Sequence, residues 1–213
     1  DNNPILKLFI PRYNEIAFIK GPMENTEANQ RFEIYCKILR ENNIEVREEL
    51  IVEGIFNEIA GVRAIKTLLD ERHIKPEVII CSSDTIAFGV YSELKERKIN
   101  IPYEIAVVGF DDVDSAILLT PPLTTVKQPL YDQGKKAIDL LLSKIDDNMN
   151  AGDITLNSSL IIRESCGCHP WYDLYIGLRE SFKNKRETSR TAKFEWDSFR
   201  QFVKRHRDDL FKN

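Results

Sequence analysis

The stretch VIICSSDTIAFGVYSEL, residues 78–94, joins a strand pattern directly to a helix pattern. Its first four residues form an uninterrupted apolar run, which is typical of a strand buried on both faces of a parallel sheet. The serines and the aspartate at 82–84 are residue types that begin helices, because their side-chain oxygens accept hydrogen bonds from unpaired backbone N–H groups. The predicted helix buries a stripe made of Ile86, Ala87, Val90 and Leu94. The stretch therefore predicts one strand followed by one helix.

The same order of elements is found on both sides of this stretch. Apolar runs predict strands at 16–19, 49–53 and 105–110, and helical stripes follow the first two of them. Strands that alternate with helices predict βαβ units, and therefore an α/β fold in which helices flank both faces of a parallel sheet. Ligands bind such sheets beyond the carboxyl ends of the strands. Those ends are predicted at residues 21–22, 54–56, 82–84 and 111–112.

After residue 120 this alternation stops. Residues 124–129 have an extended pattern, residues 130–145 carry a helical stripe, and residues 160–163 have a strand pattern. Residues 169–213 contain 11 Lys or Arg and 7 Asp or Glu, whereas the whole chain has a net charge of −4. This shift in charge predicts a boundary near residue 168, between an α/β domain at 1–168 and a helical extension at 169–213.

The composition is that of an ordinary globular protein, with 42% hydrophobic and 30% charged residues. No apolar run approaches the roughly 20 residues that a membrane-spanning helix requires, so no membrane partner is expected. The net charge of −4 argues against nucleic-acid binding by this chain itself. Cys36 lies in a helical pattern and Cys81 in an apolar strand pattern. Both are expected to be buried, reduced thiols, which indicates a cytoplasmic protein.

Catalytic and metal-binding motifs are weak in this sequence. Cys166-Gly167-Cys168 could suggest metal or redox chemistry, but no second pair of Cys or His lies at ligand spacing. We therefore expect two resting thiols near a strand end, no metal and no cofactor. The chain has only three histidines, no G-x-S-x-G motif and no P-loop. The sequence thus predicts a protein that is not an enzyme.

Several short segments occur together in the order and spacing of one protein family. They are IAFIKGP at 16–22, GIF at 54–56, SD at 83–84, VGFDD at 108–112, PPLTTV at 121–126, QP at 128–129 and RES at 163–165. Together they resemble the ligand-binding core of the lac-repressor (LacI/GalR) family, over roughly residues 14–168. The ending RESCGC, residues 163–168, resembles a sub-branch in which such sensor domains are fused to signalling output modules.

The resemblance implies a periplasmic-binding-protein-like fold, mainly its second lobe, with the first lobe incomplete in this chain. It implies a sensor of a small polar ligand, such as a sugar or a related metabolite, in a transcriptional or signal-transduction regulator. It also implies a homodimer, and contact with DNA only through a headpiece that is absent from this chain. The alternative is a periplasmic transport-type sugar-binding protein, which the unpaired cysteines disfavour.

Two charged residues match ligand-contacting positions of the family. Arg31 lies on the first predicted helix, and its guanidinium fork suits vicinal hydroxyls or a carboxylate. Asp111 directly follows an apolar strand, where its carboxylate could accept two hydroxyl hydrogen bonds. The alternatives are an arginine on a solvated helix face and an aspartate in a turn or helix cap. Asp112 is expected to be structural.

Three further residues are candidate ligand contacts by the same resemblance. Phe56 lies where relatives place an aromatic that stacks on a sugar ring, and the alternative is a core phenylalanine. Ser83 stands where many relatives carry Asn, and its alternative is an N-cap for the third helix. Gln128 lies at the crossover between the lobes, where it could bind the ligand or stabilise a hinge. Asp84 is expected to be structural.

Overall fold

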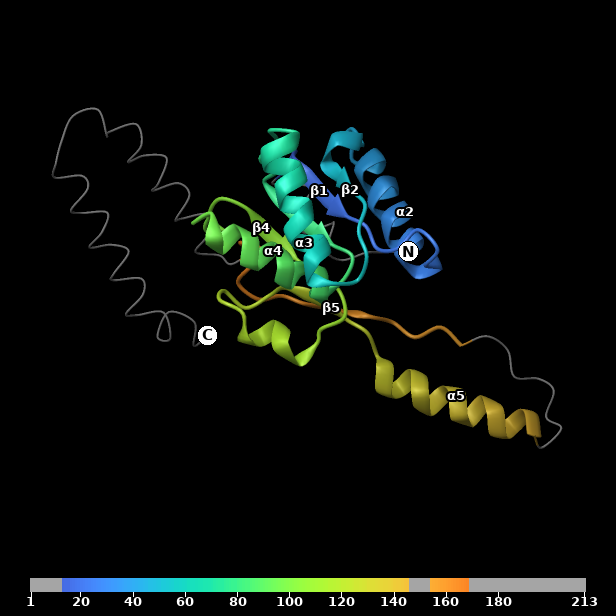
Figure 1. Cartoon of the computed structure of the whole chain (residues 1–213). Helices are drawn as coiled ribbons and strands as arrows, with labels where there is room; N and C mark the ends of the chain where they lie inside the picture. Colours follow the sequence, from blue (N-terminus) through green and yellow to red (C-terminus); the bar gives the residue numbers. More distant parts are fainter. Residues whose placement is uncertain (1–12, 146–153, 169–213) are drawn as a thin grey trace, which may run out of the picture. The chain divides into compact units, whose positions relative to one another are not determined.

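The computed structural model describes residues 13–145 and 154–168. Within them, the central element is a four-stranded sheet in the order β2-β1-β3-β4 (Figure 1). Its strands are β1 (Ile16–Ile19), β2 (Ile51–Val52), β3 (Val78–Cys81) and β4 (Ala106–Val108). All three strand pairs are parallel, which confirms the predicted α/β fold.

Two of the strands are shorter than the apolar runs that predict them. The 3₁₀ turn η1 (Glu48–Leu50) replaces the first part of the second predicted strand. At the end of β4, the backbone N–H of Gly109 donates to the carbonyl of Thr124 at 2.9 Å. The chain therefore leaves the ladder with β3 after Val108, although the apolar pattern continues to Phe110.

Three helices accompany the sheet, and each begins at a polar N-cap residue. They are α2 (Thr26–Glu41), α3 (Glu58–Lys66), which continues as the π-helical segment η2 (Thr67–Glu71), and α4 (Asp84–Glu96). The side chains of Asn25, Asn57 and Ser83 each accept a hydrogen bond from the backbone N–H three residues later. These bonds satisfy donors that a helix leaves unpaired at its start.

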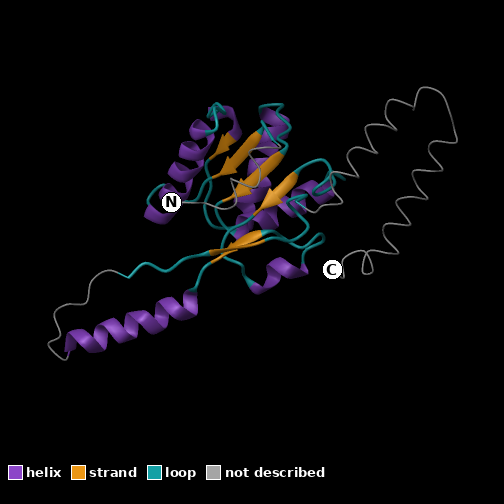
Figure 2. Cartoon of the chain, turned by 180° about the vertical axis from the view of Figure 1, so that it is seen from behind, coloured by secondary structure: helices purple, strands orange, loops and turns teal. Residues whose placement is uncertain are grey.

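The order of the strands explains which face each helix covers. The connection from β1 to β2 runs in one direction across the sheet, and the connections from β2 to β3 and from β3 to β4 run in the other. Because such crossovers are right-handed, α2 lies on one face, and α3 and α4 lie on the opposite face (Figures 1 and 2). Accordingly Phe18 packs in the cluster that contains α2, whereas its neighbours Ala17 and Ile19 pack with α3 and α4.

Helices α3 and α4 approach each other through two glycines. A Cβ atom on Gly61 would lie 2.1 Å from the carbonyl oxygen of Ile86, and a Cβ atom on Gly89 would lie 1.8 Å from that of Glu58. Real Cβ atoms do not come this close to backbone atoms. The two helices therefore pack backbone against backbone, and only glycine fits at either position.

The chain beyond β4 forms a second, smaller unit of secondary structure. After the 3₁₀ segment η3 (Asp114–Leu118), the strand β5 (Thr125–Lys127) pairs antiparallel with β6 (Ser159–Ile161). Helix α5 (Leu130–Ile145) lies between them in sequence, which confirms the predicted helical stripe. None of the residues of α5 is buried.

Some of the sequence expectations fall outside the described residues. These are the helical extension at 169–213 and the part of the predicted α/β domain at residues 1–12. The boundary near residue 168 therefore stays a prediction. Among the helices that the structure does describe, none is both long enough and apolar enough to cross a membrane.

Candidate functional site

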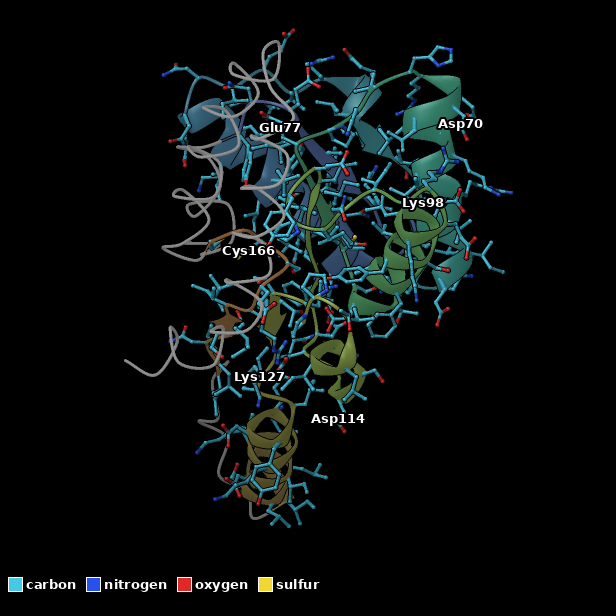
Figure 3. The ribbon with its side chains drawn as sticks, turned by 90° about the vertical axis from the view of Figure 1, so that its left-hand side faces the viewer. Asp70, Glu77, Lys98, Asp114, Lys127 and Cys166 are labelled. Carbon is cyan, nitrogen blue, oxygen red and sulfur yellow. The ribbon has the colours of Figure 1, made fainter. Side chains whose placement is uncertain are left out.

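The candidate site lies at the carboxyl ends of β1 and β3. These strands are neighbours, but the chain leaving β1 passes through α2 to one side of the sheet, and the chain leaving β3 passes through α4 to the other. Open α/β sheets bind ligands at such a switch point. In Figure 3 this end of the sheet faces the labelled residues Lys127 and Asp114. Glu77, which precedes β3, is labelled toward the opposite end of the view.

Arg31 extends from α2 to this end of the sheet. Its Nη1 donates to the carbonyl oxygen of Ser82, just after β3, at 2.8 Å. Its guanidinium carbon lies 3.8 Å from the ring centroid of Phe110, and Nη2 lies 3.4 Å from Glu27. The side chain is only 14% exposed. The alternative of an arginine on a solvated helix face is therefore wrong.

Asp111 lies near Arg31, because it directly follows Phe110, whose ring lies against the guanidinium of Arg31. Burial raises the pKa of Asp111, while a hydrogen bond from Gln128 and the charge of Arg31 lower it. Burial lowers the pKa of Arg31, and the charge of Asp111 raises it. Two opposite charges that are 80 residues apart in sequence thus influence each other in the fold.

Gln128 holds the carboxylate of Asp111 in place. Its Nε2 donates to Oδ1 of Asp111 at 2.6 Å. The backbone N–H of Asp111 donates to the carbonyl of Val126 at 2.8 Å, which ties the same residue to β5. The sequence left two roles open for Gln128, a ligand contact or a hinge contact, and this bond does not decide between them. It shows that Gln128 contacts a candidate ligand-binding side chain.

The backbone at Asp111 and Asp112 is strained. Their φ angles are 122° and 55°, a region that residues with a Cβ atom rarely adopt. Such conformations cost of order 1–3 kcal/mol each and concentrate at functional sites. The strain aims the two adjacent carboxylates at different partners, since Asp111 contacts Gln128 and Asp112 contacts Arg163.

Asp112 and Asp84 have structural roles, as expected. Oδ1 of Asp112 accepts from Nη2 of Arg163 at 2.6 Å. Asp84 is fully buried and accepts from the hydroxyl of Thr125 at 2.6 Å and from the backbone N–H of Val113 at 3.0 Å. These bonds connect the start of α4 and the loop after β4 to β5, and so hold Asp111 against the sheet.

Phe56 lies at the same end of the sheet but is not a core residue. Its side chain is 36% exposed, so the alternative of a core phenylalanine is wrong. A Cβ atom on Gly21 would lie 2.5 Å from the ring of Phe56 and 2.8 Å from the Cβ of Ala28. The ring therefore rests on the loop after β1, beside the start of α2. The side chain is thus partly accessible to solvent.

Ser83 has the structural role that the sequence left open. Its Oγ accepts from the backbone N–H of Ile86 at 3.3 Å, and the residue is only 3% exposed. The hydroxyl is thus engaged as the N-cap of α4, and a direct ligand contact by Ser83 stays a prediction. The preceding Ser82 differs, because its buried hydroxyl has no hydrogen-bond partner among the described residues.

Comparison with known proteins agrees with this fold. The family model described as the periplasmic binding protein-like domain matches residues 11–166. The chain belongs to this family. Within it, the chain is of the type found in LacI/GalR repressors.

Three relatives show how far this similarity extends. The ribose operon repressor of Haemophilus influenzae is 34% identical over 154 residues, covering 72% of this chain and 46% of that protein. The structure of the transcriptional regulator CelR with cellobiose matches with a TM-score of 0.70 and 28% identity, over 75% of this chain and 49% of that one. The lac repressor dimer bound to operator and an anti-inducer matches with a TM-score of 0.70 and 27% identity, over 76% and 48%. The chain spans about half the length of these relatives.

Three residues at the site of this periplasmic-binding-protein-like domain were not predicted. Phe110 lies against the guanidinium of Arg31, Ser82 offers its carbonyl to the same group, and Glu27 lies one helical turn before Arg31. The i,i+4 spacing of Glu27 and Arg31 on α2 could have indicated the ion pair. The contacts of Ser82 and Phe110 with Arg31 depend on how the sheet and α2 pack, which no local pattern contains.

The site of this periplasmic-binding-protein-like domain suits a polar organic ligand. Among the residues that the structure describes, no group of three or more His, Cys, Asp or Glu could hold a metal ion. The side chains that come together are a guanidinium, a carboxylate, an amide and aromatic rings. These groups bind hydroxyls and sugar rings by hydrogen bonding and stacking.

Proposed function

We propose that this domain senses a small polyhydroxylated ligand, such as a sugar or a related metabolite, for a bacterial regulator. The observation that carries the proposal is the arrangement at the switch point of the sheet, where the guanidinium of Arg31 lies 3.8 Å from the ring centroid of Phe110 and the next residue, Asp111, is hydrogen-bonded to Gln128. Relatives support the ligand class, since one is named for the ribose operon and another was solved with cellobiose. The domain acts as a binding module and performs no catalysis.

The chemistry of these two charged groups fits hydroxyl recognition. The carboxylate of Asp111 keeps acceptor capacity beyond its bond to Gln128, because an ionised carboxylate has about four lone-pair sites. Arg31 has five N–H donors, and the contacts to Ser82 and Glu27 leave others available. Partial burial strengthens each hydrogen bond to a ligand, because the surrounding dielectric is lower than that of water.

We propose that the ligand signal controls transcription. The relatives are transcriptional repressors, and the lac repressor was solved on its operator. In this proposal, DNA is bound by a headpiece that is not part of residues 1–213. The alternative is that the ligand signal passes to a signalling output domain after residue 213. We place the protein in the cytoplasm, because its cysteines are reduced thiols.

Calorimetry with ribose and cellobiose as probes tests the ligand class. The wild-type chain is expected to bind at least one of the two sugars. For that sugar, we expect Asp111→Asn and Arg31→Lys each to weaken binding by about 2 kcal/mol, because each removes a charge-assisted hydrogen bond. That loss corresponds to a roughly thirtyfold higher Kd. Asp114→Asn, an exposed carboxylate three residues further on, and Arg40→Lys, an exposed arginine on the same helix, are matched controls. Unchanged affinity in both site variants would refute the assignment.

We further propose that the chain forms a homodimer. Helix α5 leaves six large apolar side chains more than half exposed: Leu130, Tyr131, Ile138, Leu141, Leu142 and Ile145. Exposed apolar surface of this kind marks an association site. A relative of similar fold was solved as a dimer, which supports the proposal.

Light scattering at micromolar concentration should therefore give about twice the chain mass of 24.7 kDa. If α5 is part of the interface, Ile138→Glu with Leu142→Glu should shift the mass to that of the monomer, because the charges would be buried unpaired. Lys136→Glu changes an exposed charge on the opposite side of the same helix and should leave the mass unchanged. A wild-type mass of 24.7 kDa would rule out the dimer.

A further inference from the structure

We propose that Cys166 and Cys168 form a redox-active dithiol, which thiol–disulfide exchange with a low-molecular-weight disulfide such as oxidised glutathione converts to a Cys166–Cys168 disulfide. This site is separate from the ligand site. It would add a response to the thiol redox state to the proposed ligand sensor.

The two cysteines contact each other in a turn after β6, where Figure 3 labels Cys166. The backbone N–H of Cys168 donates to Sγ of Cys166 at 3.2 Å, and Sγ of Cys168 donates to the carbonyl oxygen of Cys166 at 3.4 Å. Gly167 between them has φ 64°, which lets the chain turn sharply. A disulfide needs Cβ atoms about 3.8 Å apart, and the two hydrogen bonds already hold each sulfur against the backbone of the other cysteine.

The two sulfurs differ in accessibility in the way that a dithiol reaction requires. Cys166 is fully buried, whereas Cys168 is partly exposed. Cys36 and Cys81 lie within α2 and β3, and both are buried. Cys168 is therefore the cysteine of the described residues that a small disulfide can reach, and Cys166 is placed to react with it next.

The acid–base properties of Cys166 support this order of reaction. Interaction with the side chain of Cys168, together with hydrogen bonds from Thr124 and the backbone, lowers the pKa of Cys166 to about 7 although burial opposes it. Burial instead raises the pKa of Cys36 and of Cys81. Because the thiolate is the nucleophile in exchange, Cys166 is reactive near neutral pH and the other two buried thiols are not.

The reaction proceeds in two displacements. Cys168 loses its proton to solvent and attacks one sulfur of oxidised glutathione, so that a Cys168–glutathione disulfide forms and one glutathione thiolate leaves. The Cys166 thiolate then attacks the sulfur of Cys168, and the second glutathione thiolate leaves. The two leaving thiolates take up the protons that the cysteines lost. Two protein thiols are oxidised and one glutathione disulfide is reduced to two thiols.

Mass spectrometry of the whole chain, equilibrated anaerobically at pH 7 with graded mixtures of reduced and oxidised glutathione, tests the proposal. After an acid quench and alkylation, trypsin cleaves at Arg163 and Arg179 and releases a peptide that contains Cys166, Cys168 and no other cysteine. We expect this peptide to become lighter by two hydrogen atoms and to escape alkylation as the oxidised fraction rises. A peptide that stays fully alkylated throughout would overturn the proposal.

Single substitutions separate the two roles. Cys166→Ser, or Cys166→Ala should serine not be tolerated in the buried position, should leave glutathione attached to Cys168, because the second displacement is lost. Cys168→Ser should leave Cys166 unmodified, and Cys36→Ser should leave formation of the internal disulfide unchanged. Persistent glutathione on Cys168 in the wild-type chain would also overturn the proposal, since it would mean that Cys166 does not react with it.

Discussion

Replacing Gly89 with alanine is expected to lower the free energy of unfolding by about 3 kcal/mol, because overpacking of a tight core costs up to this amount. The added Cβ atom would lie 1.8 Å from the carbonyl oxygen of Glu58. That oxygen belongs to the backbone of α3, so no side-chain rotation relieves the clash and the two helices must separate. Gly61→Ala meets the carbonyl of Ile86 at 2.1 Å and should have a similar effect.

Urea unfolding followed by circular dichroism measures this loss as a lower midpoint. Gly134→Ala is the matched control, because it makes the same change in α5, where a new Cβ atom meets nothing within 4 Å. Alanine favours helix over glycine by about 1 kcal/mol, so the control should keep or raise stability. Equal midpoints for Gly89→Ala and the wild-type chain would show that the helices are not in backbone contact.

Replacing Asp84 with alanine should cost about 3 kcal/mol by a different cause. It removes the acceptor of the Thr125 hydroxyl and of the Val113 N–H and leaves these two donors without a partner. An unpaired buried donor costs about 1–3 kcal/mol, and relief of the buried charge offsets part of the sum. Asp84→Asn keeps one acceptor oxygen and should cost less. Equal urea midpoints for Asp84→Ala and the wild type would contradict the role of these bonds.

The same residue predicts a pH dependence. Burial raises the pKa of Asp84 in the folded chain, although bonds from Thr125 and Val113 oppose this. The folded state therefore holds this proton more tightly than the unfolded state, and the contribution of Asp84 to stability falls as the pH rises from its unfolded pKa to its folded pKa. Measured against Asp84→Asn, the wild-type chain should gain stability as the pH is lowered through that range. A constant difference would mean that Asp84 does not titrate abnormally.

Local patterns were sufficient to predict the strands and helices but not all of their ends. The apolar runs of β1 and β3 match the structure, because a strand buried on both faces needs apolar residues throughout. The end of β4 is different, since Gly109 hydrogen-bonds to Thr124 from a distant part of the chain. An apolar run shows where a strand can form, and long-range hydrogen bonds decide where it stops.

The candidate site was predictable where the family resemblance supplied the residue. The resemblance supplied Arg31 and Asp111, whose charges influence each other in the fold, and their contact with a ligand stays a prediction. The contact of Arg31 with the carbonyl of Ser82 was not foreseeable, because a backbone carbonyl carries no residue identity. The engagement of Ser83 as an N-cap follows from a local rule, but local rules could not decide between that role and a ligand contact.

The segment after β6 also protects the outer edge of the sheet. The backbone N–H of Val107 donates to the carbonyl of Ser165 at 3.0 Å, and the hydroxyl of Ser165 donates to the carbonyl of Val107 at 2.6 Å. Without this cover, β4 would present unpaired backbone groups to the next molecule, which is how sheets aggregate edge to edge. A proteolytic cut after residue 162 would therefore give a product that precipitates rather than a smaller stable domain.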